Sequence, residues 1–200
     1  MIGYDEIFER VKEEFLKHGS KGEERLIHSI GVSETAVKLV KTYRPNDTIL
    51  IEKARLAGIV HDYAKFLEYN DFLELLKKHN IQLELKKEFM PIYHGYVGYL
   101  YIEDELGIHD KEILDAIIYH STGRSEMTFL DKVLFIADYV EPNRKGEFFE
   151  KIRSVAFTDL DLACFYEAEN TYNYLKGLNR NVFFETVNAY NYYKNIIENR

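Results

Sequence analysis

Proline is nearly absent from this chain, and its absence constrains the fold more than any other feature of the sequence. The 200 residues contain only Pro45, Pro91 and Pro142, and the stretches between them carry apolar residues at three- and four-residue spacing. Because proline breaks helices and that spacing puts apolar side chains on one helical face, these stretches are expected to be helical. No alternating pattern typical of strands competes. We therefore predict an all-α fold.

The apolar spacing also predicts where the helices lie. A first apolar stripe precedes Gly19, and Ser20 with Glu23 has the spacing of a capping box that starts a second helix. Glycines at Gly107 and Gly123 indicate turns between later helices. The expected helices run from this box to Tyr43 and then over about 48–62, 71–79, 92–106, 111–121, 128–140, 147–157, 159–176 and 184–198.

Composition and charge exclude several classes of protein. With 46% hydrophobic and 30% charged residues the chain is typical of a folded protein, and 200 residues form one domain, 1–200. The net charge of −8 argues against binding to a nucleic-acid polymer. The single Cys164 forms no internal disulfide or thiolate zinc site, no leader pattern follows Met1, and no apolar run could span a bilayer. We therefore expect a cytoplasmic protein that does not bind membranes.

Several histidines and aspartates lie within or beside apolar helical stretches, where an unpaired polar group costs about 1–3 kcal/mol. They are His28, the adjacent His61 and Asp62, His94, His120 and Asp138. Imidazole nitrogens and carboxylate oxygens together suit a divalent metal such as iron, manganese or zinc, and a helical bundle brings ligands from separate helices to one centre. His18, His79 and His109 lie beside glycine, asparagine or charged residues and are interpreted as ordinary histidines.

The order of these residues resembles a known family. The series His28, His61-Asp62 and Asp138 is similar to the H…HD…D metal motif of the HD-domain phosphohydrolases. Over about 20–190, five separate words resemble the YqeK branch of that superfamily: His28-Ser29-Ile30-Gly31-Val32, Leu56-Ala57-Gly58-Ile59-Val60-His61-Asp62-Tyr63-Ala64-Lys65, His94-Gly95-Tyr96-Val97-Gly98, Ala116-Ile117-Ile118-Tyr119-His120-Ser121-Thr122-Gly123 and Ala137-Asp138-Tyr139-Val140-Glu141-Pro142-Asn143-Arg144. Five motifs in this order are more specific than H…HD…D alone.

The resemblance implies a single-domain HD-type helical bundle with the metal site in its core. The implied metal-binding core covers about 20–145, and C-terminal helices over 147–198 complete the nucleotide pocket. Iron is the implied metal, with manganese or another divalent metal as alternatives and one or two ions bound. The implied metal ligands are His28, His61, Asp62 and Asp138.

The resemblance also implies contacts to a nucleotide. His94 and His120 match positions that hold phosphates or a second metal, and Lys65 and Arg144 match phosphate-contacting cations. A turn before the last helix contacts the nucleotide in the family, and Val182-Phe183-Phe184 stands there instead of the common Ile-His-Pro. The expected catalytic residues are Asp62, His94 and His120. The expected nucleotide contacts are His28, Lys65, His94, His120, Ser121, Asp138, Arg144, Asn181, Val182, Phe183, Phe184, Glu185 and Thr186.

The implied activity is symmetrical hydrolysis of diadenosine tetraphosphate to two ADP. Such a reaction needs positive charge on the phosphoryl oxygens and a water activated by metal, whose pKa falls toward about 7 in favourable sites. Two alternatives stay open. One is another HD phosphohydrolase, which acts on a guanosine alarmone or a deoxynucleotide and leaves a product such as GDP. The other is a regulatory protein that binds nucleotide without turnover. Tyrosines in the last helix are compatible with a homodimer and equally with an internal core.

Overall fold

The structure is a computed structural model that describes residues 3–200. Met1 and Ile2 lie outside the described residues, and so does the start of the chain on which the expected lack of a leader rests. The described chain is all-helical without strands, which confirms the predicted fold class. None of its helices is long and apolar enough to cross a membrane. The elements are α1 (Tyr4–Leu16), α2 (Gly19–Tyr43), α3 (Thr48–Val60), α4 (Tyr69–Lys78), the 3₁₀ helix η1 (Lys87–Ile92), α5 (Tyr93–Tyr96), α6 (Tyr99–Leu106), α7 (Lys111–Tyr119), α8 (Phe129–Val140), α9 (Glu147–Ala156), α10 (Leu160–Gly177) and α11 (Phe184–Glu198).

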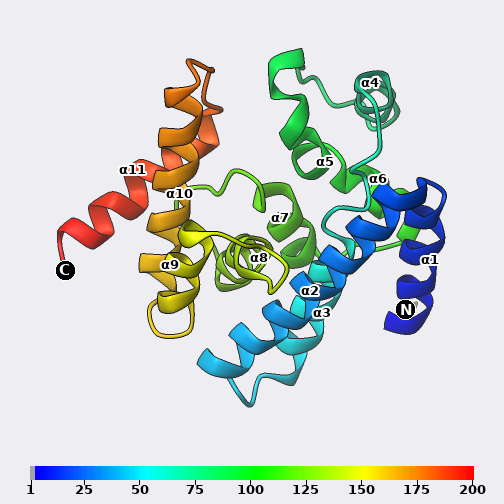
Figure 1. Ribbon diagram of the computed structural model, residues 1–200. Helices are drawn as coiled ribbons and strands as arrows, with labels where there is room; N and C mark the ends of the chain where they lie inside the picture. Colours follow the sequence, from blue (N-terminus) through cyan, green and yellow to red (C-terminus); the bar gives the residue numbers. More distant parts are fainter. Residues whose placement is uncertain (1–2) are drawn as a thin grey trace.

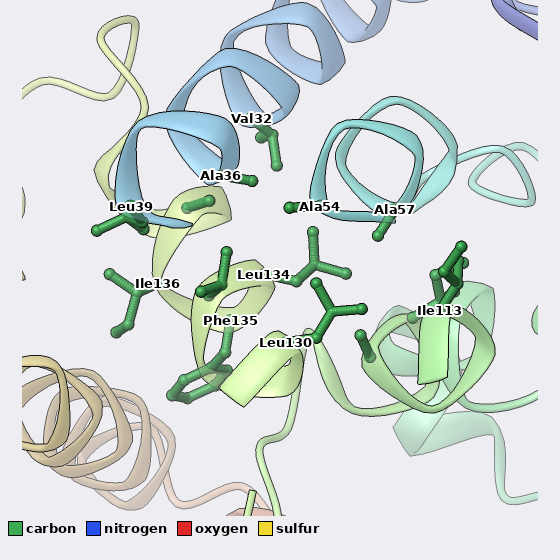
Figure 2. Close-up of a cluster of buried hydrophobic side chains, with 14 of the residues drawn as sticks. Val32, Ala36, Leu39, Ala54, Ala57, Ile113, Leu130, Leu134, Phe135 and Ile136 are labelled. Atoms are coloured by element: carbon green, nitrogen blue, oxygen red, sulfur yellow. The ribbon is translucent and has the colours of Figure 1, made fainter. Parts of the chain in front are cut away.

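Helices α2, α3 and α8 pack against one another at the centre of the molecule. Figure 2 shows Val32 of α2, Ala54 of α3 and Leu134 of α8 pointing toward one another, and all three are fully buried. The contact between α2 and α3 is close, because a Cβ atom on Gly58 would lie 2.5 Å from the Cα atom of Ser33. Burying each aliphatic side chain in such a core contributes about 1.5–3 kcal/mol, so these central contacts stabilise the fold.

The other helices surround this centre (Figure 1). Helix α1 packs on α2 and α3, α7 packs on α3 and α8, and α9 and α10 pack on α8. Helix α11 covers α10. A smaller apolar cluster that includes Phe72, Tyr93 and Leu100 joins the segment from α4 to α6. This segment and the α10–α11 pair therefore lie on either side of α7 and α8 (Figure 1).

The predicted capping box at Ser20 and Glu23 is wrong. Helix α2 begins at Gly19, with His18 as the residue before it, and no side chain caps its first turn. Gly19 has a φ of +61°, a left-handed conformation that glycine adopts readily. The chain therefore turns at this glycine, and Ser20 already lies inside the first helical turn.

A single helix over 92–106 is also wrong, because the chain bends between α5 and α6. The backbone N–H of Gly98 donates to the carbonyl of Tyr93 at 2.8 Å. Helix α5 packs on α7 so closely that a Cβ atom on Gly95 would lie 2.7 Å from the carbonyl oxygen of Ile117. Tertiary packing thus overrides the continuous apolar pattern.

The remaining helices agree with the predicted ranges to within two residues at each end. The predicted turns are confirmed at Gly107, where α6 ends, and at Gly123, which follows α7; both have a φ of +64°.

Candidate metal centre and its two clefts

The candidate ligands extend the apolar stripes of the three central helices. Residues four apart lie on one face of a helix, so each ligand lies one turn from a core side chain on the same face. The pairs are His28 with Val32 on α2, His61 with Ala57 at the end of α3, and Asp138 with Leu134 on α8. The packing that buries the apolar stripes therefore also gathers these polar side chains at one end of the core.

The first group of ligands surrounds Asp62 and Asp138. His28 Nε2 lies 2.9 Å from Asp138 Oδ1 and 3.8 Å from Asp62 Oδ2. His61 Nε2 lies 3.4 Å from Asp62 Oδ2 and 4.0 Å from Asp138 Oδ1. Two imidazoles and two carboxylates, carried by α2, the end of α3 and α8, thus face a common point.

The second group shares Asp62 and adds two histidines. His94 Nε2 lies 3.0 Å from Asp62 Oδ1 and 3.0 Å from His120 Nε2. The hydroxyl of Ser121 lies 2.9 Å from His120 Nε2. Asp62 therefore presents one oxygen to each group, an arrangement suited to a carboxylate that bridges two ions.

Backbone contacts determine which nitrogen of two histidines is available. His61 Nδ1 lies 2.7 Å from the carbonyl oxygen of Gly58, and His120 Nδ1 lies 2.7 Å from that of Ile117. A carbonyl only accepts a hydrogen bond, so Nδ1 is protonated in both rings and Nε2 is the nitrogen left to bind a cation. Three buried atoms at the centre make no hydrogen bond of good geometry: His28 Nε2, His61 Nε2 and Asp62 Oδ1.

Both carboxyl groups are ionised. Burial raises the pKa of Asp62, but the charges of Lys65 and His61 lower it by more, so the pKa lies well below its usual range. Burial likewise raises the pKa of Asp138, and the neighbouring His28 and the charge of His61 hold it well below the usual value. The centre therefore contains two buried negative charges, which a cation would stabilise.

The imidazoles respond to their different neighbours. Burial lowers the pKa of His94, and Lys65 lowers it further. Burial and the nearby His94 and His61 hold the pKa of His120 well below its usual value. Burial lowers the pKa of His61 too, but the adjacent carboxylates raise it more strongly, so the net shift is upward. His94 and His120 are thus neutral at pH 7, and His61 lies where positive charge is favoured.

This donor set fits a divalent cation. Neutral imidazoles and ionised carboxylates are ligands of iron, manganese and zinc, and a cation would satisfy the three buried atoms that make no hydrogen bond. Ligand atoms lie within 4.8 Å of one another in three overlapping groups: His28, His61 and Asp62; His61, His120 and Asp138; Asp62, His94 and His120.

Comparison with known proteins identifies this arrangement. The family model described as the HD domain matches residues 25–143. The chain belongs to the HD domain family. This chain is 40% identical to a symmetrical bis(5′-nucleosyl)-tetraphosphatase of Halalkalibacterium halodurans over 158 residues. The matched region covers 79% of this chain and 82% of that protein. The Bacillus subtilis protein of the same name is 36% identical, over 80% of this chain and 84% of its own.

A solved structure has the same fold over its full length. It is a predicted HD superfamily hydrolase from Clostridium acetobutylicum that is described as involved in NAD metabolism. It superimposes with a TM-score of 0.83 at 33% identity and covers 100% of both chains. The HD-type bundle predicted from the sequence is therefore confirmed, and the chain is a member of the branch that contains the symmetrical tetraphosphatases.

Three basic side chains contact the carboxylates of this HD domain. Arg25 Nη1 donates to Asp62 Oδ2 at 2.6 Å, and Lys65 Nζ lies 3.4 Å from Asp62 Oδ1. Arg144 Nη2 donates to Asp138 Oδ1 at 2.9 Å. Their remaining donors are placed to contact an anion beside the cluster, where charge-assisted hydrogen bonds are strong.

Sequence reasoning missed Arg25 and Glu141. Arg25 precedes His28 by three residues on the same face of α2, and this spacing was the available signal. Glu141 Oε1 lies 3.2 Å from His28 Nδ1, and its Oε2 accepts the backbone N–H of Asn143 at 2.7 Å. A carboxylate behind an imidazole orients it toward a metal, so Glu141 is a positioning residue for His28.

A large cleft borders the cluster on the side of η1 and α10. This η1–α10 cleft has a volume of about 890 Å³ and is lined by η1, the end of α10 and the turn before α11. Phe89 and Phe183 meet in its wall with ring centroids 5.2 Å apart. At its inner end lie Lys65, His94 and Ser121, so the cleft leads to the second ligand group.

The predicted nucleotide turn contributes half of its residues to this cleft. The residues that line it are Asn181, Phe183 and Thr186. Those outside its lining are Val182, Phe184 and Glu185. Helix α11 already begins at Phe184, so successive side chains from there on point in different directions. The side-chain Nδ2 of Asn181 donates to Glu88 Oε2 of η1 at 3.0 Å.

A second cleft lies on the other side of Lys65. This α2 cleft has a volume of about 460 Å³. It is lined by Lys21, Glu24, Arg25, His28, Lys65, Phe66, Glu141 and Arg144. Because His28 borders this cleft and His94 borders the η1–α10 cleft, the ligand cluster lies between the two.

Proposed function

We propose that this HD domain protein hydrolyses diadenosine tetraphosphate symmetrically to two ADP, using a metal-activated water. The observation that carries the proposal is a buried His–Asp cluster that opens to two clefts and is flanked by Arg25, Lys65 and Arg144. A tetraphosphate is a dense anion, and these cations lie where its oxygens would approach the cluster. The name that the relatives carry agrees with this chemistry.

Each residue has a proposed role. His28, His61, Asp62 and Asp138 would hold a divalent ion, which supplies Lewis acidity and lowers the pKa of water toward about 7. Lys65 and Arg144 would bind phosphoryl oxygens and stabilise the charge that develops there.

The two remaining histidines act from the η1–α10 side. His94 Nε2 lies 3.1 Å from Lys65 Nζ, so both would contact the same phosphate. His120 orients His94 across the 3.0 Å contact between their Nε2 atoms and would provide a ligand if a second ion binds. Ser121 Oγ, which lies 3.3 Å from His94 Nε2, is a further phosphate donor.

We assign iron to the centre, with one or two ions bound and with manganese or another divalent metal as alternatives. The donors are imidazoles and carboxylates without a thiolate, since the single Cys164 is buried elsewhere in the fold. Such sets suit iron and manganese better than structural zinc. Elemental analysis of purified protein tests the assignment of iron, and a site filled by manganese or another divalent metal without iron would replace iron by that alternative.

The C-terminal helices over 147–198 complete the nucleotide pocket in this proposal. The end of α10 and the turn before α11 form one wall of the η1–α10 cleft, opposite η1. The metal-binding part over about 20–145 supplies the other residues. The cytoplasmic location and the homodimer stay predictions.

The proposal is tested by the products of metal-loaded protein with diadenosine tetraphosphate in oxygen-18 water. We expect ADP as the sole nucleotide at early times, with label in one of each two ADP molecules. ATP and AMP in equal amounts would contradict symmetrical cleavage.

The same assay separates the alternatives. Faster turnover of a guanosine alarmone or a deoxynucleotide than of diadenosine tetraphosphate would favour another HD phosphohydrolase. Tight binding of nucleotide without any product, at full metal content, would favour the regulatory protein.

A further inference from the structure

Both clefts border the ligand cluster, the α2 cleft at His28 and the η1–α10 cleft at His94. Among residues 3–200, Lys65 is the one side chain that lines both clefts. If the cluster holds the phosphorus under attack, a chain of phosphates that crosses it has one end in each cleft. Symmetrical cleavage, the function proposed above on which this inference rests, needs two phosphates and a nucleoside on each side of the broken bond.

The α2 cleft has the charge that a diphosphate requires. Four of its lining residues are basic, against two carboxylates. Arg25 and Arg144 are already engaged by the carboxylates of the cluster at 2.6 and 2.9 Å, and Lys65 lies 3.4 Å from Asp62. Lys21 lines the same cleft and is exposed, so its ammonium group is available to a phosphate.

The same cleft has an aromatic wall. Phe66 lines it and is held in place by the ring of His18, stacked at 3.9 Å between centroids, and by the edge of Phe15 at 6.1 Å. Aromatic side chains bind bases through stacking or edge contacts regardless of base identity. A volume of about 460 Å³ lies within the usual range of ligand pockets, about 300–1,000 Å³.

We propose that the α2 cleft binds the second nucleoside diphosphate half of the substrate, with Lys21 on its phosphates and Phe66 against its base. The η1–α10 cleft holds the first half. The half bound in the α2 cleft leaves as ADP when the central P–O bond is hydrolysed by water. Since the product complex then contains two ADP molecules, the metal-loaded protein has two ADP sites per chain.

Equilibrium dialysis of radiolabelled ADP against metal-loaded protein tests this without turnover. We expect saturation at two ADP per chain. Lys21→Glu and Phe66→Leu should each weaken the second site by about fivefold or more, because one reverses a charge beside phosphate and the other removes a ring. Lys38→Glu, at an exposed lysine on the same helix outside both clefts, is the matched control for the charge reversal and should bind as wild type does. Saturation at one ADP per chain in the wild type would overturn the proposal.

Kinetics give an independent readout. Phe66→Leu should raise the KM for diadenosine tetraphosphate about fivefold but leave the KM for adenosine 5′-tetraphosphate, which lacks the second adenosine, within twofold. Equal changes for both substrates would overturn the base contact, and circular dichroism confirms that the variant is folded. If the protein hydrolyses the substrate to ADP but binds only one ADP per chain, the second subsite is contradicted and the proposed function is not. If it binds two ADP per chain but forms no product, the proposed function is contradicted and the second subsite is not.

Discussion

The apolar core and the metal centre are built on the same three helices, four residues apart, yet they differ in what holds them together. In the core, Val32, Ala57 and Leu134 are fully buried and fill the space between α2, α3 and α8 (Figure 2). One turn further, His28, His61 and Asp62 bury polar atoms that make no hydrogen bond. The core is complete by itself, whereas the centre is complete only with a cation.

We infer from this difference that the packed helices position the metal ligands, and that the ligand side chains do not stabilise the packing of the helices. An unpaired buried polar atom costs about 1–3 kcal/mol, so the metal-free centre reduces stability that the apolar stripes supply. Substitutions in the two regions should therefore separate stability from metal binding.

The largest effect is expected from His61→Ala, which removes a central ligand. We expect activity to fall by roughly a thousandfold or more, because metal-assisted catalysis contributes several kcal/mol. Bound metal should fall in parallel, while circular dichroism stays that of a helical protein. Elemental analysis and turnover check this. Loss of the helical circular dichroism signal in the variant would contradict this distinction between core and metal centre, because the ligand would then be needed for folding.

Leu134→Ala should have the reverse effect. The side chain is fully buried one turn before Asp138, and its removal leaves a cavity that costs about 2–5 kcal/mol of unfolding free energy. Denaturant titration measures the loss, which should exceed that of His61→Ala in metal-free protein. Well below its unfolding transition, the variant should bind as much metal as the wild type. Loss of metal from the folded variant would show that the two regions are not separable.

Arg144→Ala and Lys65→Ala sharpen the comparison at the edge of the metal centre. Each removes a charge-assisted contact to phosphate worth about 1.5–3 kcal/mol, or roughly tenfold or more in kcat/KM. Metal content should stay near that of the wild type, because neither side chain is a ligand. Steady-state kinetics with metal analysis tests this. Wild-type kinetics in both variants would show that Arg144 and Lys65 do not contact the phosphates of the substrate.

The smallest effect concerns the two ends of α7. The helix ends at Tyr119, next to His120 of the metal centre, and begins after Asp110. Asp110 Oδ1 accepts the N–H groups of Glu112 and Ile113, and its Oδ2 lies 2.9 Å from Lys53 Nζ. Burial raises the pKa of Asp110, but Lys53 and the backbone N–H of Ile113 lower it more, so its pKa lies below the usual value. A polar group with partners thus stabilises one end of the helix.

Because the pKa of Asp110 is lowered by folding, the stability from its charge is present above its ordinary pKa of about 3.9 and is lost as pH falls through the folded value. Asp110→Ala should cost about 1 kcal/mol or less at pH 7, since the group is partly exposed. Asp110→Asn keeps the cap and should cost less at pH 7. Thermal unfolding at decreasing pH should show the difference between wild type and Asp110→Asn begin to shrink near the ordinary pKa of about 3.9 and close as the pH falls through the lower folded pKa. A constant difference over this range would contradict the charge effect.

The sequence alone determined the fold class and most of the polar cluster. Apolar spacing without proline predicts helices because helix periodicity is a local property, and His28, His61 and Asp138 were recognisable because polar residues interrupt these stripes. The resemblance to HD-domain proteins added the order of the motifs. Boundaries followed to within two residues wherever no close packing intervened.

Only the tertiary structure decided which distant segments meet. The bend at Gly98 follows from the packing of α5 on α7, and the partnership of Arg25 with Asp62 joins residues 37 apart in the chain. The two clefts likewise need walls from α2, η1 and α10, which no local pattern places together. Local periodicity specifies which face of a helix is buried, but the identity of the neighbour depends on how all the faces pack at once.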